Sequence, residues 1–128
     1  MLPLSEIDEY FNKAYNKLIA SKGLYEMEQY STAVSTCYYA MFLTAKALLI
    51  NKGIKIGKTH NGLIHAFNNY LVHQDNFPLE IYQYFASTQS LREEADYDAF
   101  DGITQNIAKE KIKQAEKFIE EAKKFTKF

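Results

Sequence analysis

Apolar residues recur along most of this chain at steps of three and four, the spacing that places side chains on one face of an α-helix. No segment shows sustained alternation of apolar and polar residues, which would indicate a strand. Glycine and proline interrupt the helical pattern, and Thr59 and Thr104 each stand where they could cap a helix. The expected helices, separated by Gly23, Gly53 to Gly57, the Asn76-Phe77-Pro78 turn and Asp101-Gly102, are 4–22, 25–51, 60–75, 79–100 and 105–125.

The connections between these segments are short, which favours helices that pack as antiparallel neighbours. The pattern therefore predicts an all-α fold, an antiparallel up-down bundle of four to five helices. The 128 residues are enough for one core, and no linker divides them, so we expect a single domain over residues 1–128.

The segment from about Tyr25 to about Asn51 is apolar on nearly every side. A helix of this kind has to be covered all round, so we expect it at the centre of the bundle or also at a subunit interface. Residues 33–50 carry a single charge, Lys46, over a length that could span a bilayer. Polar residues lie on all sides of this segment, which favours a buried central helix and no membrane partner.

The overall charge excludes a protein that binds nucleic acid through a global basic field. Fifteen Lys and Arg against sixteen Asp and Glu leave a net charge of -1, so any RNA contact has to be local. The single cysteine, Cys37, excludes an internal disulfide and is expected to be a small core residue. The N-terminus lacks the basic and apolar regions of a secretory signal, so we expect a cytoplasmic protein.

Arg92 is the one arginine among fifteen basic residues. Its planar guanidinium can grip a phosphate or a carboxylate with two parallel hydrogen bonds, which a lysine does less well. Arg92 follows Phe85 and Thr88 in heptad-like steps, so it should lie on the inward face of its helix. The alternative is a weak helix-surface ion pair with Asp96, four residues further on.

The start of the third predicted helix carries His60 and Asn61, and such a helix N-terminus can receive an anion or simply face water. His60 and His65 are five residues apart, which does not suit a pair of zinc ligands on one helix face. His73 is expected to face solvent or to cap the helix end. The sequence therefore predicts no metal site and no cofactor.

Four groups of residues occur in a characteristic order. They are Tyr38-Tyr39-Ala40-Met41-Phe42, then Thr59-His60-Asn61-Gly62 with Phe67, then Arg92-x-x-Ala95-Asp96-Tyr97, and finally Ala108, Ala115 and Phe118. In this order and spacing they resemble the HEPN domain (higher eukaryotes and prokaryotes nucleotide-binding), in its branch of small bacterial and archaeal proteins. The resemblance covers almost the whole chain.

The resemblance implies a helical bundle that forms a homodimer and is often encoded beside a minimal nucleotidyltransferase in a toxin-antitoxin pair. Many members of the family are metal-independent ribonucleases. Their arginine and a histidine that follows it after four to six residues meet the same pair of the second subunit. There the arginine stabilises the charge of the phosphorane, and the histidine moves a proton at the 2′-hydroxyl or the leaving oxygen.

This chain departs from that pattern, because positions 97, 98 and 99 hold Tyr97, Asp98 and Ala99 instead of a histidine. A phenol with a pKa of ~10 is a poor base at neutral pH. One hypothesis is that His60 folds against the fourth helix and supplies the imidazole. Another is that Tyr97 accepts an adenylate from the nucleotidyltransferase, as a tyrosine near the arginine motif does in some family members.

Two functional hypotheses follow. In the first, the chain is the toxin-like half of a nucleotidyltransferase/HEPN pair, which binds RNA or a nucleotide near Arg92 through Asp96, His60 and Asn61. Arg92, Tyr97 and His60 are then the candidate catalytic residues of a metal-independent ribonuclease. In the second, the chain is a catalytically silent module for dimerisation or partner binding, in which Arg92 and Asp96 form a structural pair.

Overall fold

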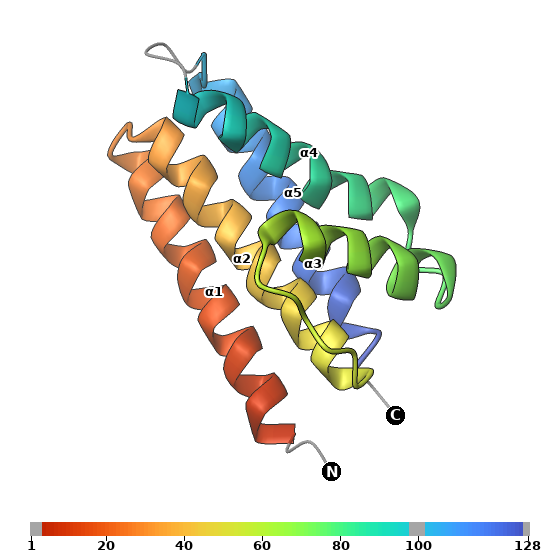
Figure 1. Ribbon diagram of the computed structural model, residues 1–128. Coiled ribbons are helices and arrows are strands. Elements are labelled where there is room, and N and C mark those ends of the chain that lie inside the picture. Colours follow the sequence, from red (N-terminus) through yellow and green to blue (C-terminus); the bar gives the residue numbers. More distant parts are fainter. Residues whose placement is uncertain (1–3, 98–101, 127–128) are drawn as a thin grey trace.

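The structure, a computed structural model, describes residues 4–97 and 102–126, and all regular elements within these ranges are helices. Four long helices, α1 (Leu4–Glu26), α2 (Tyr30–Asn51), α4 (Leu79–Tyr97) and α5 (Gln105–Lys123), run up and down to form an antiparallel bundle (Figure 1). The short α3 (His60–Phe67) continues into one π-helical segment, η1 (Asn68–His73). The predicted all-α up-down bundle is confirmed.

Helix α2 lies at the centre of the bundle, where it contacts α1, α3, α4 and α5. Buried residues cover most of its circumference, among them Val34, Met41 and Leu48 on one face and Ala40 and Ala47 on the next, while Tyr39 stays exposed. Helix α2 is long and apolar enough to cross a membrane, but 67% of its most apolar window is buried by the other helices. The central position predicted from its all-round apolar pattern is therefore confirmed, and packing accounts for that pattern.

The break between the first two helices is not where the sequence suggested. Gly23 lies inside α1, which continues to Glu26, and the left-handed residue is Glu28, with φ 61°. The amide of Gln29 donates to the carbonyl of Leu24 at 2.9 Å, and the amide of Glu28 donates to that of Tyr25 at 3.0 Å. These two bonds form a Schellman motif, which ends a helix by its backbone geometry even without glycine.

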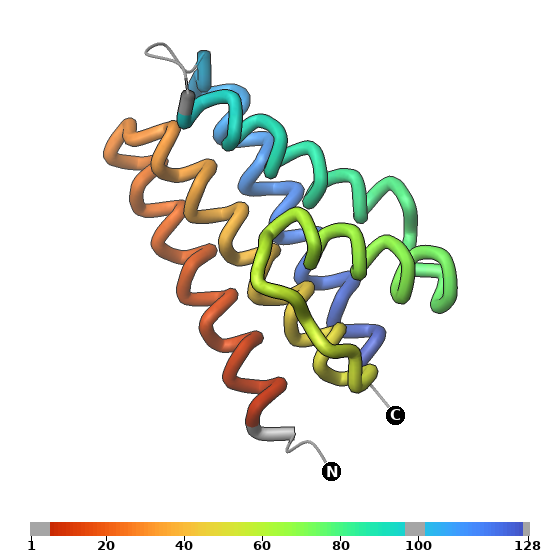
Figure 2. The backbone as a smooth tube through the Cα atoms, in the orientation of Figure 1, coloured from red at the N-terminus to blue at the C-terminus, as the bar shows by residue number. Residues whose placement is uncertain are grey.

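The other helix boundaries follow the predicted signals. Thr59 Oγ1 accepts a hydrogen bond from the Gly62 amide at 2.9 Å and caps α3, and Thr104 Oγ1 accepts one from the Ile107 amide at 3.2 Å and caps α5. Gly53, with φ 76°, ends α2 in a second Schellman motif. The smoothed backbone in Figure 2 shows the loop after α2 running back along the bundle before α3 begins.

Aromatic residues hold α3 against α4 and α5. The ring of Phe67 lies 5.6 Å from that of Phe118 and 6.2 Å from that of Phe85, and all three side chains are fully buried. Edge-to-face and tilted pairs of this kind are favourable beyond the apolar area that they bury. This cluster packs the end of α3 against α4 and α5, while His60 stands at the other end of the same short helix.

Candidate functional site

Arg92 lies on the inward face of α4, as its spacing from Phe85 and Thr88 predicted. Phe85 and Thr88 are fully buried, whereas Arg92 is half-buried. The guanidinium carbon lies 5.3 Å from the centre of the Tyr38 ring, within range of a cation–π interaction. Nη1 also donates to Gln89 Oε1 at 3.3 Å. The aromatic ring and the amide together hold the guanidinium in place on the inner side of the helix.

The predicted ion pair between Arg92 and Asp96 is not present among the described side chains. Asp96 is exposed, and Arg92 instead donates to Gln89, whose Nε2 in turn donates to Glu93 Oε1 at 2.9 Å. The ion pair does not form because the guanidinium makes a cation–π contact with the Tyr38 ring. This contact places it on the α2 side of α4 and away from the solvent side. The structural pair of the second hypothesis is therefore wrong in this form.

His60, the first residue of α3, lies against α2 at the same place. Its Nδ1 is 2.8 Å from the hydroxyl oxygen of Tyr38, and its ring stacks on that of Phe42 at 4.3 Å. The rings of His60 and Tyr38 are 5.8 Å apart and inclined by 27°. Tyr38 thus touches both His60 and Arg92, and it joins the two residues that the sequence had placed 32 positions apart.

The protonation states follow from burial and from the charge of Arg92. Burial raises the pKa of Tyr38 well above the usual range of a phenol, so its hydroxyl keeps its proton. Burial, and next to it the positive charge of Arg92, lower the pKa of His60 from its ordinary value of 6.5. His60 is therefore neutral at pH 7. A protonated phenol is the better donor of the two groups, so we assign Tyr38 as donor and His60 Nδ1 as acceptor.

This assignment leaves Nε2 as the nitrogen of His60 that can meet a ligand. The ring is partly exposed, while Nδ1 is engaged by Tyr38. A fixed cation and a neutral imidazole beside it can bind a phosphate oxygen, the imidazole through its Nε2–H, and they can also stabilise charge as a reaction proceeds. The arrangement therefore suits phosphate chemistry without a metal.

The other predicted site residues are less closely involved. Asn61 is exposed on the first turn of α3, and His65 and His73 are also exposed. The side chain of Tyr97 lies outside the described residues, so its predicted role as an adenylate acceptor stays a prediction. Among the described residues, no group of three or more His, Cys, Asp and Glu side chains could hold a metal ion.

Three residues of the site were missed as functional candidates. Tyr38 and Phe42 were assigned to the core because they sit in an apolar helical stretch, and Gln89 carried no motif. The adjacent tyrosines of Tyr38-Tyr39 were the available signal, because a phenol that packs in a core usually needs a polar partner. The structure shows that this partner is His60.

Cys37 lies one position before this site in the sequence but has no place in it. Its side chain is fully buried, its thiol donates to the Val34 carbonyl at 3.3 Å, and burial raises its pKa to about 12. A thiol in this state is neither a nucleophile nor a ligand at neutral pH. The prediction that Cys37 is a packing residue is confirmed.

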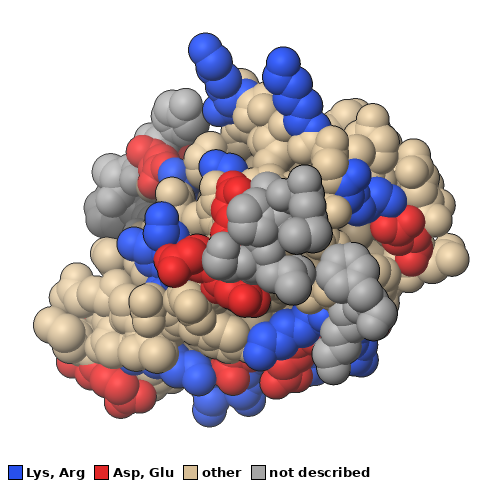
Figure 3. Space-filling view, turned by 90° about the horizontal axis from the view of Figure 1, so that it is seen from below, with Lys and Arg blue, Asp and Glu red and all other residues tan. Residues whose placement is uncertain are grey.

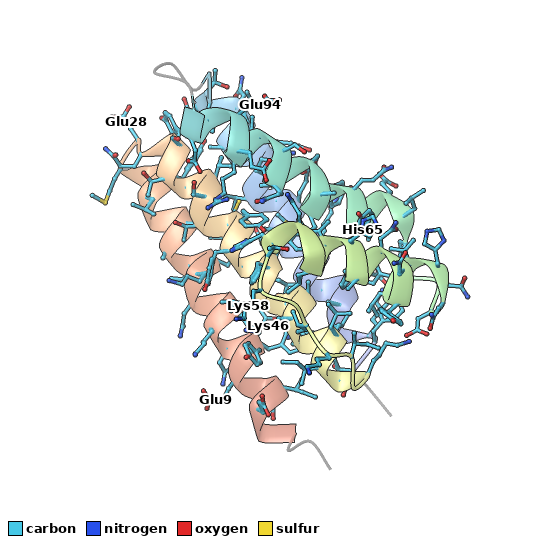
Figure 4. All side chains as sticks on the ribbon, in the orientation of Figure 1. Glu9, Glu28, Lys46, Lys58, His65 and Glu94 are labelled. Carbon is cyan, nitrogen blue, oxygen red and sulfur yellow. The ribbon has the colours of Figure 1, made fainter. Side chains whose placement is uncertain are left out.

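The charges around the bundle are mixed. On the face shown in Figure 3, lysine and arginine side chains alternate with aspartate and glutamate side chains, and no single basic surface dominates. Figure 4 places Glu28 at the turn between α1 and α2, and Glu94 at the same end of the bundle on α4. Any attraction of a polyanion is therefore local, as the net charge of -1 predicted.

Comparisons with known proteins agree with the fold and with the resemblance. The family model described as "HEPN domain" matches residues 7–125. "Putative toxin MJ0605" of Methanocaldococcus jannaschii is 37% identical over 95% of this chain and 90% of its own length. "Putative toxin MJ0142" of the same organism is 33% identical over 94% and 81%, and a "UPF0332 protein" of Archaeoglobus fulgidus is 34% identical over 94% of both chains.

Proposed function

The chain belongs to the HEPN domain family, and on this basis we propose that it is a toxin-like HEPN protein that binds RNA or a nucleotide through Arg92 and His60. The observation that carries the proposal is the contact of Tyr38 with both residues, its ring with Arg92 at 5.3 Å and its hydroxyl with His60 at 2.8 Å. Two relatives named as toxins support the toxin-like role.

In this proposal His60 takes the part of the histidine that is missing after Arg92. Arg92 binds a non-bridging phosphate oxygen and stabilises the charge that builds up there as the 2′-hydroxyl attacks. His60, kept neutral by burial and by Arg92, donates its Nε2–H to a phosphate oxygen; in the other tautomer, in which Nδ1–H donates to the Tyr38 hydroxyl, Nε2 is free to take the proton of the 2′-hydroxyl. Tyr38 is a positioning residue, because its hydroxyl sets the orientation of the imidazole ring and its own ring supports the guanidinium.

The proposal also includes a nucleotidyltransferase as the second component of the pair and a homodimer as the working form. The family resemblance supports both. Coexpression with the neighbouring gene, followed by intact mass measurement, tests the first. An adenylate added to the wild type but not to a Tyr97→Phe variant supports both the nucleotidyltransferase partner and Tyr97 as the acceptor. An unchanged mass of the wild type and of the variant contradicts both.

Cleavage of total RNA in the presence of EDTA tests the main proposal. We expect Arg92→Ala and His60→Ala each to reduce the rate at least 100-fold, because a general acid or base and a charge-stabilising group are each typically worth that much. Arg92→Lys keeps the charge without the planar fork and should recover only part of the rate. His65→Ala is the matched control, since it removes an exposed histidine from the same helix.

The outcomes are distinct. Cleavage that survives in Arg92→Ala and His60→Ala would place the activity elsewhere and refute the site. A wild-type protein that neither cleaves RNA nor binds RNA or a nucleotide would favour the silent partner-binding module. Circular dichroism of each variant shows whether a lost activity reflects a lost fold.

A further inference from the structure

We propose that Tyr39, Phe42 and Lys17 form a base-stacking subsite for single-stranded RNA, which extends the Arg92 site along α2 toward α1. This inference rests on the proposed function and adds to it a direction for the bound strand.

The first observation is a continuous row of rings on α2. The Tyr39 ring stacks on that of Phe42 at 5.6 Å with an inclination of 29°, and Phe42 stacks on His60 at 4.3 Å with an inclination of 27°. The row ends at the imidazole that is proposed to face the phosphate. Stacking on aromatic side chains is the sequence-tolerant way in which proteins hold unpaired bases.

The second observation is the exposure of Tyr39. Its side chain is 41% exposed, and it is the one aromatic residue among the four large hydrophobic residues that are exposed in the described part of the chain. Tyr38 is fully buried in the core, whereas Tyr39, the next residue of the helix, lies at the surface. A tyrosine presents a flat apolar face together with a polar edge, which suits a wet interface with a nucleobase.

The third observation is the charge beside Tyr39. Lys17 on α1 places its ammonium 5.5 Å from the centre of the Tyr39 ring. Lys13 and Lys17 line an open hollow of about 480 Å³ together with Asn16, Tyr39 and Leu43, and this lining contains no carboxylate. Four other hollows on the described surface each include a carboxylate, namely Asp8, Glu80, Glu26 and Glu6.

These observations together favour a strand of RNA over other occupants. A base takes the place of the Lys17 ammonium over Tyr39, and the exposed lysine side chain turns to the adjacent phosphate. A hollow lined by Lys13 and Lys17 complements a phosphate backbone, whereas an apolar partner helix would bury the Lys17 ammonium in a hollow whose lining holds no carboxylate. The row of rings then leads the strand from this hollow toward His60 and Arg92.

Fluorescence anisotropy with the intact protein tests the inference. The probe is a fluorescein-labelled single-stranded RNA of 12 nucleotides with 2′-O-methyl groups, which the proposed chemistry cannot cleave. We expect Tyr39→Ala to raise Kd about tenfold, within the range for loss of one stacked base. Tyr39→Phe should bind like the wild type, because it keeps the ring. Lys17→Ala should lower the slope of log Kd against log salt by ~0.7, the value for one phosphate contact on a single strand.

Tyr15→Ala is the matched control. Tyr15 lies on α1 and, like Tyr39, has a lysine beside its ring, with the Lys123 ammonium 4.6 Å from the ring centre, but its hollow includes Asp8. Equal effects of Tyr15→Ala and Tyr39→Ala, or no effect of Tyr39→Ala, would overturn the subsite while leaving the Arg92 site intact. Sedimentation that shows Tyr39→Ala dissociating a dimer would overturn it too, because the face would then belong to a second copy of the chain. A wild type that neither binds the probe nor cleaves RNA would refute the proposed function and this inference together.

Discussion

The hydrogen bond between Tyr38 and His60 can be tested by removing a single oxygen atom. Tyr38→Phe deletes the hydroxyl that lies 2.8 Å from His60 Nδ1 and leaves the ring in place. The ring contacts with Arg92 at 5.3 Å and with Phe85 at 5.7 Å should persist, because neither involves the hydroxyl. The variant therefore removes the hydrogen bond to the imidazole and leaves the stacking of His60 on Phe42 in place.

The expected loss of stability is small and can be estimated. A net hydrogen bond contributes about 1 kcal/mol, and His60 is partly exposed, so water can replace part of the lost bond. We expect the free energy of unfolding to fall by about 1 kcal/mol, which is a drop in Tm of about 4 °C for a domain of this size. Tyr38→Ala, which also removes a fully buried ring, should cost about 3 to 5 kcal/mol.

Urea and thermal unfolding, followed by circular dichroism, measure these differences. Tyr10→Phe is the control, because the Tyr10 ring also lies near a cation, Lys46 at 5.4 Å, while its hydroxyl makes no side-chain hydrogen bond within the described part of the chain. A double-mutant cycle with His60→Ala should give a coupling energy of about 1 kcal/mol between Tyr38 and His60. Equal stability of Tyr38→Phe and the wild type, together with zero coupling, would refute the bond and its role in positioning His60.

Three further predictions address other parts of the structure. Because burial and Arg92 lower the pKa of His60, the unfolded chain binds this proton more readily than the folded one. The free energy of unfolding should therefore fall as the pH drops from 6.5 toward the lowered pKa, and Arg92→Ala should raise the His60 pKa in an NMR titration without restoring it fully. Cys37 should resist a thiol reagent at pH 8 until urea unfolds the chain, because it is buried and its pKa is about 12; rapid native labelling would contradict its burial. Glu28→Gly should raise the free energy of unfolding by about 1 kcal/mol, since glycine favours the φ of 61° found there. Glu26→Gly, inside α1, should lower it by a similar amount, and a destabilised Glu28→Gly chain would show that the Schellman motif is not formed.

The helices were predictable because their signals are local. Periodic apolar residues, a threonine cap at Thr59 and a glycine at Gly53 each act within one or two turns of chain. The failure at Gly23 has a physical reason as well. A glycine can adopt the backbone conformation that ends a helix, but it can also stay helical. Here α1 continues past Gly23 to Glu26 and ends where Glu28 takes the left-handed conformation and the Schellman bonds to Leu24 and Tyr25 form.

The site was predictable only in part. The uniqueness of Arg92 and the pattern of α4 identified the residue and the side of the helix on which it lies, because both are properties of the sequence. The alternative that the sequence left open was an ion pair with Asp96, four residues further along the same helix. The structure replaced that partner with Tyr38 and Gln89, because a buried aromatic face on α2 competes with a surface ion pair that water screens.

By itself, the sequence determined the helical class, the central place of α2 and the identity of Arg92 as the distinctive cation. These features depend only on the order and composition of the residues, which the sequence gives directly. Only the tertiary structure decided that Tyr38 bridges Arg92 and His60, and that Tyr39 stays at the surface beside Lys17. These contacts join α2 to α1, α3 and α4. They depend on how whole helices rotate and pack against one another, which is set by the sum of many buried contacts and not by any local motif.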